Sequence, residues 1–298
     1  MIFFEYYKDI IPDFSSFQES LKTPLPAHLR INLLKAKPLD VFTSLTAQGV
    51  SYQRLSELDE TLIQVSGLAS PGNLLEYAQG HIHPQAFTSC LVSLALCPRP
   101  DSLVLDMCSA PGGKTAHLAQ MMDQSGLIVA NELYPSRQIP LAHTLGRLGV
   151  LNTILTGYQA QEFPLRQRFD FILADVPCTG EGRFRATPGR AGPRIGRGRG
   201  KLIELQRKIL LRGFDLLQDG GAMIYSTCTY DPEENEGIVS FLLENRPAVV
   251  LPIDVGFTYA SGLTEWKGRK YDSRLHRAAR FYPHLIDSVG FFMAKIGR

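Results

Sequence analysis

The sequence Asp106-Met-Cys-Ser-Ala-Pro-Gly-Gly-Lys-Thr115 lies between an apolar stretch at 102–106 and a helical stretch at 114–122. Its small residues let the backbone pass close to a ligand, and the first turn of the helix offers free N–H groups. Neither the Walker A spacing nor the GxGxxG spacing is present. The stretch is therefore either a ligand-binding loop or a tight strand-to-helix turn of the kind that α/β folds often contain.

Four more apolar stretches follow, each short enough for a strand, with helical stretches such as 201–217 between them. The apolar stretches cover 126–130, 152–155, 169–174 and 222–226. Buried strands that alternate with helices are typical of an α/β, Rossmann-like fold with a doubly wound and mostly parallel sheet. Ligands of such sheets bind beyond the carboxyl ends of the strands. Four side chains are expected to converge there: Asp106, Glu132, Asp175 and Cys228.

The chain is expected to divide into a small N-terminal α+β domain at 1–79 and a larger domain at 80–298. The elements expected in the first domain are a strand at 30–34, a helix around 41–45 and a strand at 61–65. In the second domain, a helix over 85–96 precedes the strands and helices above, and a strand at 290–295 closes the chain.

Composition indicates an ordinary globular chain, since 44% of the 298 residues are hydrophobic and 20% are charged. A net charge of +2 neither demands nor excludes a nucleic-acid partner. The five cysteines include no CxxC pair and the His81–His83 pair lacks a third ligand, so we expect neither a disulfide framework nor a metal. We see no signal peptide and no apolar run of about 18 residues. We therefore expect a monomeric, cytoplasmic protein outside membranes.

Two cysteines lie in loops at the predicted active edge, Cys178 within 175–182 and Cys228 within 225–236. A lone cysteine is usually a small buried hydrophobic residue, whereas a polar, glycine-rich loop favours a reactive thiol. A thiolate that adds to C6 of cytosine makes C5 nucleophilic enough to accept a methyl group. An acid such as Asp175 can hold the ring near N3 as charge builds. The target base must leave its stack to reach such a pocket.

The residues after Cys228 predict the start of a helix. Pro232 suits a first helical position, and Glu233 and Glu234 behind it would complement the helix dipole. We expect this role for the two acids, and it leaves Cys228 unexplained.

Four stretches, at 106–115, 174–182, 225–236 and 290–295, resemble in order and spacing those of the Nop/Sun family of RNA cytosine-5 methyltransferases. The resemblance spans nearly the whole chain and includes, more weakly, 30–38 and 80–90. It implies a Rossmann-like class I methyltransferase domain with S-adenosyl-methionine as cofactor. It also implies RNA as partner, with ribosomal RNA (rRNA) ahead of transfer RNA (tRNA).

The resemblance also implies a role for several residues. Cys228 would be the nucleophile that attacks the cytosine, and Cys178 would assist release of the methylated product. Asp175 would face both the cofactor and the cytosine, and Glu132 would bind the ribose hydroxyls of the cofactor. The residues lining the methionine and ribose of the cofactor would be Cys108, Ser109, Ala110, Pro111, Gly112, Gly113 and Lys114.

The chain departs from the family after the third expected strand, where an aspartate usually contacts the adenine of the cofactor. The stretch 156–160 carries no acid. We expect Tyr158 to stack on the adenine or Gln159 to hydrogen-bond to its amine instead.

A basic segment at 183–201 directly follows the Cys178 loop and contains no acid. Such a charge run is often only a solvated loop. Its position beside the expected site favours contact with RNA phosphates. The residues expected to bind RNA are Arg183, Arg185, Arg190, Arg194, Arg197, Arg199 and Lys201.

Three rival functions remain open. A catalytically inactive RNA-binding assembly factor would keep the fold, and only the missing third acid supports it. A DNA cytosine-5 methyltransferase would use Cys178 as its nucleophile. A small-molecule methyltransferase would leave both cysteines and the basic segment unexplained. With an RNA substrate, the N-terminal domain is expected to help grip the RNA.

Overall fold

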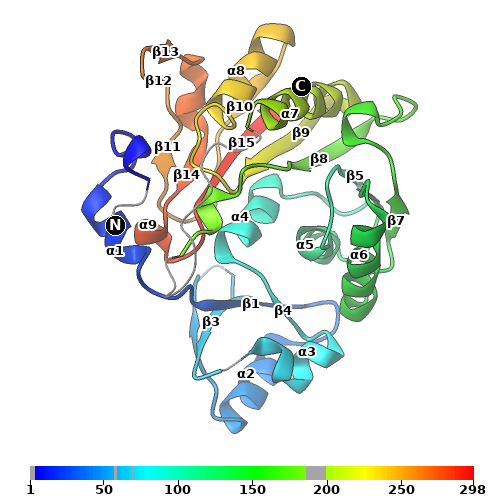
Figure 1. The fold of residues 1–298 in the computed structure, drawn as a ribbon. Coiled ribbons are helices and arrows are strands. Elements are labelled where there is room, and N and C mark those ends of the chain that lie inside the picture. Colours follow the sequence, from blue (N-terminus) through cyan, green and yellow to red (C-terminus); the bar gives the residue numbers. More distant parts are fainter. Residues whose placement is uncertain (1–3, 57–58, 69, 186–198) are drawn as a thin grey trace.

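The computed structural model describes residues 4–56, 59–68, 70–185 and 199–298, which form two main sheets and a small hairpin (Figure 1). In spatial order, the strands of the larger sheet are β11 (Ala260–Ser261), β14 (Ala279–Phe281), β15 (Phe291–Gly297), β9 (Leu217–Thr227), β8 (Phe169–Asp175), β5 (Leu103–Asp106), β6 (Leu127–Asn131) and β7 (Thr153–Thr156). The short strand β10 (Val249–Leu251) pairs with the end of β15.

The five strands from β9 to β7 are mutually parallel, and β15 runs antiparallel to β9. The predicted doubly wound, mostly parallel sheet and the predicted closing strand are therefore confirmed. The expected helical stretch at 201–217 is also present, as a helix over Arg199–Leu216.

Helices cover both faces of this sheet. On one face lie α4 (Phe87–Leu96), α5 (Gly113–Met121) and, against α5, α6 (Pro135–Leu148). On the other face lie α7 (Arg199–Leu216) and α8 (Glu236–Asn245). Alternate residues of β8 enter opposite cores, since Phe171 and Leu173 contact the α4–α5 side while Ile172 and Ala174 contact the α7–α8 side. Burial on both faces explains why the strands read as continuous apolar runs.

The smaller sheet is antiparallel and lies below the larger one in Figure 1. Its order is β2 (Ser51–Arg54), β3 (Leu62–Ser66), β1 (Ala27–Ile31) and β4 (Ile82–Pro84), and its helices are α2 (Pro38–Ala47) and α3 (Leu75–Gln79). The expected strand at 30–34 lies about three residues earlier than predicted, because Asn32 begins a turn that Lys35 and Ala36 close with hydrogen bonds to its carbonyl.

The structure divides the chain differently from the expected boundary at residue 79. Strand β4 lies after that boundary but pairs with β1 of the smaller sheet. Residues before Ala27 also join the larger domain, because Phe4, Tyr7 and Phe17 are buried in the core on the α7–α8 face. The apolar surface of these aromatic side chains is buried against the larger domain instead of the smaller sheet.

The remaining elements are short. They are the helices α1 (Phe14–Ser20) and α9 (Pro283–Ile286), the hairpin strands β12 (Glu265–Trp266) and β13 (Arg269–Lys270), and 3₁₀ turns at Glu5–Tyr7, Pro71–Asn73, Ala160–Glu162, Glu181–Arg183 and Ser273–Arg277. Among the residues that the structure describes, no helix has both the length and the apolar character needed to cross a membrane.

Candidate active site

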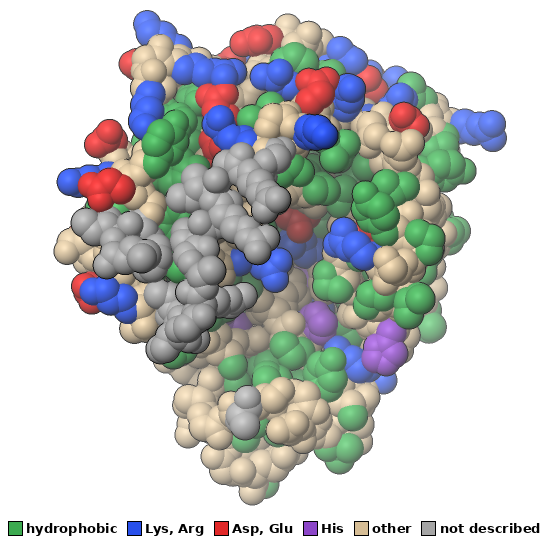
Figure 2. Space-filling model, viewed as in Figure 1, with side chains coloured by type: hydrophobic (Ala, Val, Ile, Leu, Met, Phe, Trp, Pro, Cys, Tyr) green, Lys and Arg blue, Asp and Glu red, His purple; other side chains and the backbone are tan. Residues whose placement is uncertain are grey.

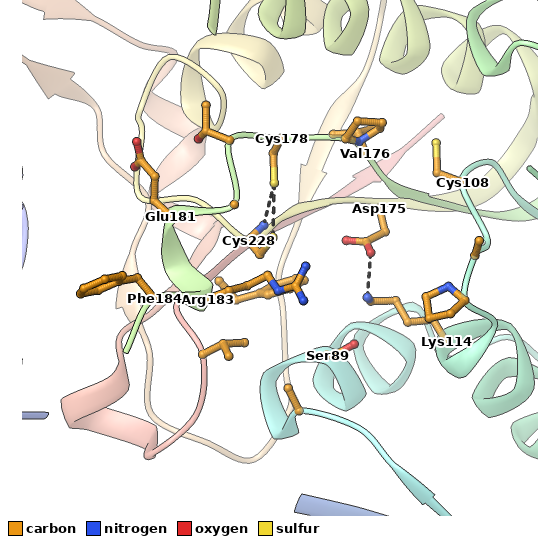
Figure 3. Close-up of a pocket in the computed structure, with 18 of the residues that line it drawn as sticks. Ser89, Cys108, Lys114, Asp175, Val176, Cys178, Glu181, Arg183, Phe184 and Cys228 are labelled. Atoms are coloured by element: carbon orange, nitrogen blue, oxygen red, sulfur yellow. Dashed lines mark hydrogen bonds and ion pairs between the residues drawn. The ribbon is translucent and has the colours of Figure 1, made fainter. Parts of the chain in front are cut away.

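A cleft of about 1250 Å³ opens at the carboxyl ends of β5, β8 and β9, and Figure 2 shows it as a hollow in the middle of one face. Figure 3 shows its lining, which includes Cys108, Lys114, Asp175, Cys178, Arg183 and Cys228. A smaller pocket of about 130 Å³ lies beside it and is lined by Gln85, Asp106 and residues 108–111 among others. The structure thus brings Asp106, Asp175 and Cys228 to one edge of the sheet.

The loop after β5 is shaped by two glycines with different roles. Gly112 has a φ of +102°, which residues with a side chain rarely adopt. A Cβ on Gly113 would lie 2.9 Å from Nε2 of His83, so this glycine lets the smaller sheet approach the loop. Asp106 is buried and accepts a 2.7 Å hydrogen bond from Oγ1 of Thr115. Burial nevertheless raises the pKa of Asp106 to about 7.

Asp175 at the end of β8 is held by two polar partners. Its Oδ2 lies 2.7 Å from Nζ of Lys114 (Figure 3), and its Oδ1 accepts a 2.8 Å hydrogen bond from Oγ of Ser226. Burial disfavours the ammonium of Lys114, but the carboxylate of Asp175 outweighs burial and raises the pKa of this lysine. Lys114 also lies over the ring of Phe291, 5.5 Å from its centroid. A fixed carboxylate and a fixed cation therefore stand side by side in the cleft.

The two loop cysteines are in direct contact. Sγ of Cys178 lies 3.4 Å from Sγ of Cys228, and the backbone N–H of Cys228 lies 3.3 Å from Sγ of Cys178 (Figure 3). Either thiol can donate this hydrogen bond; when Cys178 donates it, the bond lowers the pKa of Cys228, with help from Arg183 and Lys114 and against burial. Donating the same bond, together with burial, raises the pKa of Cys178. In that arrangement the thiolate, which is the nucleophilic form of cysteine, is favoured on Cys228 over Cys178.

The acid after β6 is placed beside the cleft. Glu132 is buried, accepts a hydrogen bond from the backbone N–H of Tyr134 and lies 3.4 Å from Arg137, which lines the cleft. The side chain of Gln159 is 3.1 Å from Glu162 and so is already hydrogen-bonded within its own turn. Tyr158 is about half exposed.

Asn131 organises this region, a role that the sequence did not reveal. Its Oδ1 accepts hydrogen bonds from the backbone of Tyr158 (2.9 Å) and from Oγ1 of Thr156 (3.0 Å). Its Nδ2 donates to the carbonyls of Met107 and Tyr158. One side chain thus ties the loop after β5 to the loop after β7. The only sequence signal was a polar residue at the end of an apolar strand.

The described residues of the basic segment at 183–201 differ in their exposure to solvent. Arg183 and Lys201 are exposed, and Arg183 lines the cleft. Arg185 is buried, where it donates hydrogen bonds to the carbonyls of Ser20 and Ser288. The expectation that Arg185 reaches RNA is therefore corrected, because its guanidinium is used inside the protein.

Arg199 is partly buried and forms an ion pair with the buried carboxylate of Asp231, with a 2.8 Å contact from Nη2 to Oδ1. Arg190, Arg194 and Arg197 lie outside the described residues.

The two acids after Pro232 are not simply charges at a helix start. Helix α8 begins at Glu236, beyond both of them. Glu234 is fully buried and accepts hydrogen bonds from the Cys178 loop, and Glu233 accepts a 2.8 Å hydrogen bond from the hydroxyl of Tyr271. Tertiary partners far along the chain decide their positions, and so the interpretation from the helix dipole was wrong.

Three further residues of the cleft were missed from the sequence. Ser89 on α4 lines both cavities, Gln85 lines the smaller pocket and Arg137 on α6 lines the cleft. Gln85 and Ser89 lie in the 80–90 stretch that resembled the family only weakly. Arg137 carries no local signal, since a cation in a helix is usually solvated.

The chain is similar to known RNA methyltransferases in both sequence and fold. A family model described as 16S rRNA methyltransferase RsmB/F matches residues 93–297. A human 28S rRNA (cytosine(4447)-C(5))-methyltransferase is 34% identical over 295 residues, which are 96% of this chain and 36% of the human protein. A Pyrococcus abyssi tRNA (cytosine(49)-C(5))-methyltransferase is 32% identical over 292 residues, covering 96% of this chain and 92% of that protein.

The fold agrees with this likeness. A solved structure of a methyltransferase homologue from Pyrococcus horikoshii superposes with a TM-score of 0.85 at 32% identity, covering 98% of this chain and 92% of the other. The chain spans only about a third to a half of the length of the human, mouse, nematode and fission-yeast relatives that it matches.

Proposed function

Because the chain belongs to the RsmB/F family of RNA methyltransferases, we propose that it transfers a methyl group from S-adenosyl-methionine to C5 of a cytosine in RNA. The observation that carries the proposal is the contact of 3.4 Å between the thiols of Cys178 and Cys228, beside Asp175. A mechanism through a covalent bond to the base gives both thiols a use. Ribosomal RNA is the favoured substrate and transfer RNA the next.

The residues of the smaller pocket suit the amino-acid end of S-adenosyl-methionine. Within the described residues, Nε2 of Gln85 and Oδ1 of Asp106 are buried without a hydrogen-bond partner, and both residues line this pocket. A donor and an acceptor in one pocket match a carboxylate and an ammonium group. The N-terminus of α5 adds free N–H groups to the same pocket. When bound there, the cofactor supplies an electrophilic methyl group.

Glu132 is proposed to accept hydrogen bonds from the ribose hydroxyls, since it is buried beside Arg137 at the rim of the cleft. Tyr158 is proposed to contact the adenine, because about half of its side chain is exposed and its ring packs edge-on against Phe163 at 5.4 Å. Gln159 is the weaker candidate, because Glu162 already occupies its amide.

In the proposed reaction, the thiolate of Cys228 forms a bond to C6 of the extruded cytosine. The electron pair of the C5–C6 double bond becomes available at C5, while the ammonium of Lys114 donates a hydrogen bond to N3 and the carboxylate of Asp175 accepts one from the exocyclic amine. After C5 has taken the methyl group, a base removes the proton from C5. The freed pair restores the double bond and expels the Cys228 sulfur as a thiolate.

RNA is proposed to enter over Arg183, Lys201 and the cleft face of the smaller domain. Arg183 and Lys201 are exposed cations of the basic segment, and Arg183 reaches the cleft beside Cys228. Phosphate contacts of this kind weaken as salt rises.

The test is methyl transfer from labelled S-adenosyl-methionine to unmodified RNA and, in parallel, to DNA. We expect the wild-type chain to label RNA, Cys228→Ala to label nothing, and Cys178→Ala to accumulate a protein–RNA adduct that survives a denaturing gel. If Cys228→Ala labels normally and Cys178→Ala is inactive, Cys228 is not the nucleophile. Cys178 is then the nucleophile, as in a DNA cytosine-5 methyltransferase. If the wild-type chain binds the cofactor but labels no RNA, the assembly-factor function is favoured.

A further inference from the structure

Each of the two cysteines is followed directly by a threonine, and the two threonines meet. Oγ1 of Thr179 lies 2.9 Å from Oγ1 of Thr229. The loops that carry Cys178 and Cys228 are 50 residues apart in the sequence, yet they are hydrogen-bonded to each other one residue beyond each thiol. A shift of either loop would therefore strain this bond before it separated the two sulfur atoms.

A buried carboxylate holds the Cys178 side of this junction. Glu234 is fully buried, and its Oε1 lies 2.6 Å from the hydroxyl of Thr179. Its Oε2 accepts a 3.1 Å hydrogen bond from the backbone N–H of the same threonine. Hydrogen bonds to a carboxylate are among the stronger ones in proteins, so both groups of Thr179 are held by one side chain.

A second buried residue holds the other side of Cys178. Nε2 of Gln206, on α7, donates a 2.8 Å hydrogen bond to Oε2 of Glu234 and a 2.8 Å hydrogen bond to the carbonyl of Pro177. The backbone is thus anchored immediately before and immediately after Cys178. Gln206 and Glu234 are each fully buried.

Cys228 is held separately from this junction. Gly182 donates a 2.9 Å hydrogen bond to the carbonyl of Cys228, and Asn235 donates a 3.0 Å hydrogen bond to the carbonyl of Thr229. Loss of the bonds to Glu234 would therefore move Cys178 more than Cys228.

We propose that Thr179, Glu234 and Gln206 are positioning residues that keep the thiol of Cys178 against the sulfur of Cys228, and that they serve the release of the methylated base. This inference rests on the proposed function. In release, the C6–sulfur bond breaks and its electron pair stays on Cys228. A thiol held 3.4 Å away can donate a hydrogen bond to that sulfur as its charge develops. Attack by Cys228 needs this thiol less, because attack consumes the thiolate charge.

Four variants test the proposal. Thr179→Val removes only the hydroxyl, and Thr179→Ser restores it. Glu234→Gln keeps the size of the side chain but turns an amide NH₂ toward groups that are themselves donors. Thr61→Val is the matched control, because Thr61 is a buried threonine whose hydroxyl also lies 2.6 Å from a carboxylate, that of Asp59 in the connection between β2 and β3.

The first measurement needs neither RNA nor methyl transfer. The rate of Cys228 alkylation by iodoacetamide is followed against pH in each variant under reducing conditions, with the modified residue identified by mass spectrometry. Thr179→Val and Glu234→Gln are expected to shift the profile upward by about one pH unit, toward that of Cys178→Ala. Thr179→Ser and Thr61→Val are expected to match the wild-type chain. A merely structural role would lower thermal stability without moving this profile.

The second measurement is the fraction of protein trapped as RNA adduct during methyl transfer. Thr179→Val and Glu234→Gln are expected to raise it about tenfold or more through slow release, with Thr179→Ser near wild type. If Cys178→Ala traps an adduct while Thr179→Val and Glu234→Gln match wild type in both measurements, the positioning role is overturned and the proposed function stands. If none of the variants forms an adduct, and Cys178→Ala does not either, the proposed function fails. The positioning role is then decided by the alkylation profiles alone. Should Thr179→Val fail to fold, Glu234→Gln carries the comparison.

Discussion

At the residue scale, the site places acids where burial opposes their charge. Glu181 lies in the Cys178 loop, is buried, and accepts hydrogen bonds from the hydroxyls of Tyr7 and Thr229. Burial raises the pKa of Glu181 to about 7, with the nearby charge of Asp231 adding to the effect. An acid whose pKa is raised on folding destabilises the fold as it ionises, so its cost grows as pH rises from about 4.5 to above 7.

Glu181→Gln is therefore expected to stabilise the protein at pH 8 by roughly 1–3 kcal/mol, because the variant has no charge to bury. The gain should shrink toward zero as pH falls below about 4.5, where the wild-type acid becomes protonated in both the folded and the unfolded state. Urea unfolding at pH 8 and pH 5 measures the difference. Glu244→Gln, at an exposed position on α8, is the control and should change little at either pH. A gain that is equal at both pH values would contradict the raised pKa.

At the element scale, close backbone contacts join the loops that form the cleft. The 3₁₀ turn at Glu181–Arg183 lies between the Cys228 loop and the start of β15. Gly182 donates to the carbonyl of Cys228 at 2.9 Å and accepts from the N–H of Gly290 at 2.8 Å. These two bonds explain why the stretches at 174–182, 225–236 and 290–295 occur together: they touch at one point of the structure.

Gly182→Ala is expected to cost about 1–3 kcal/mol of stability and to slow the alkylation of Cys228. The added Cβ would lie 2.2 Å from the carbonyl oxygen of Gly290 and 3.0 Å from that of Cys228, so one of the two loops must move. Gly146→Ala, inside α6 with no atom within 4 Å of the new Cβ, is the control and should raise stability by up to about 1 kcal/mol. Urea unfolding and alkylation rates check both. Wild-type behaviour of Gly182→Ala would show that this contact does not position Cys228.

At the scale of the whole molecule, buried ion pairs connect distant parts of the larger domain. Arg280 on β14 and Glu236 on α8 form two hydrogen bonds, of 2.7 and 2.5 Å, and only 2% and 0% of their side chains are exposed. Arg280 also donates to the carbonyl of Tyr230 at 3.0 Å. Strand β14 is thereby fixed to the helix that follows the Cys228 loop.

Arg280→Met is expected to lower the free energy of unfolding by about 3–5 kcal/mol, because it leaves the Glu236 carboxylate buried without its cation. Arg246→Met removes a similar two-bond pair with Asp215, but both of those side chains are 34% exposed. Solvent screens that pair, and its loss should cost about 0–1 kcal/mol. Urea unfolding of both variants provides the comparison. Equal losses of unfolding free energy in the two variants would mean that burial does not determine how much the Arg280–Glu236 pair stabilises the protein.

The sequence by itself determined the parallel sheet, its closing strand and the two cysteine loops, because apolar periodicity and turn residues are local signals. Residues at strand ends converge in any parallel sheet, so Asp106, Asp175 and Cys228 could be placed together without a structure. Only the tertiary structure showed that β4 belongs to the smaller sheet, that Arg185 is buried and that Glu234 holds Thr179. These outcomes depend on contacts between residues that are 50 or more positions apart in the sequence. The residue types along one sequence do not specify such contacts. The same carboxylate can be solvated, cap a helix or hold a catalytic loop, and tertiary packing alone selects among these.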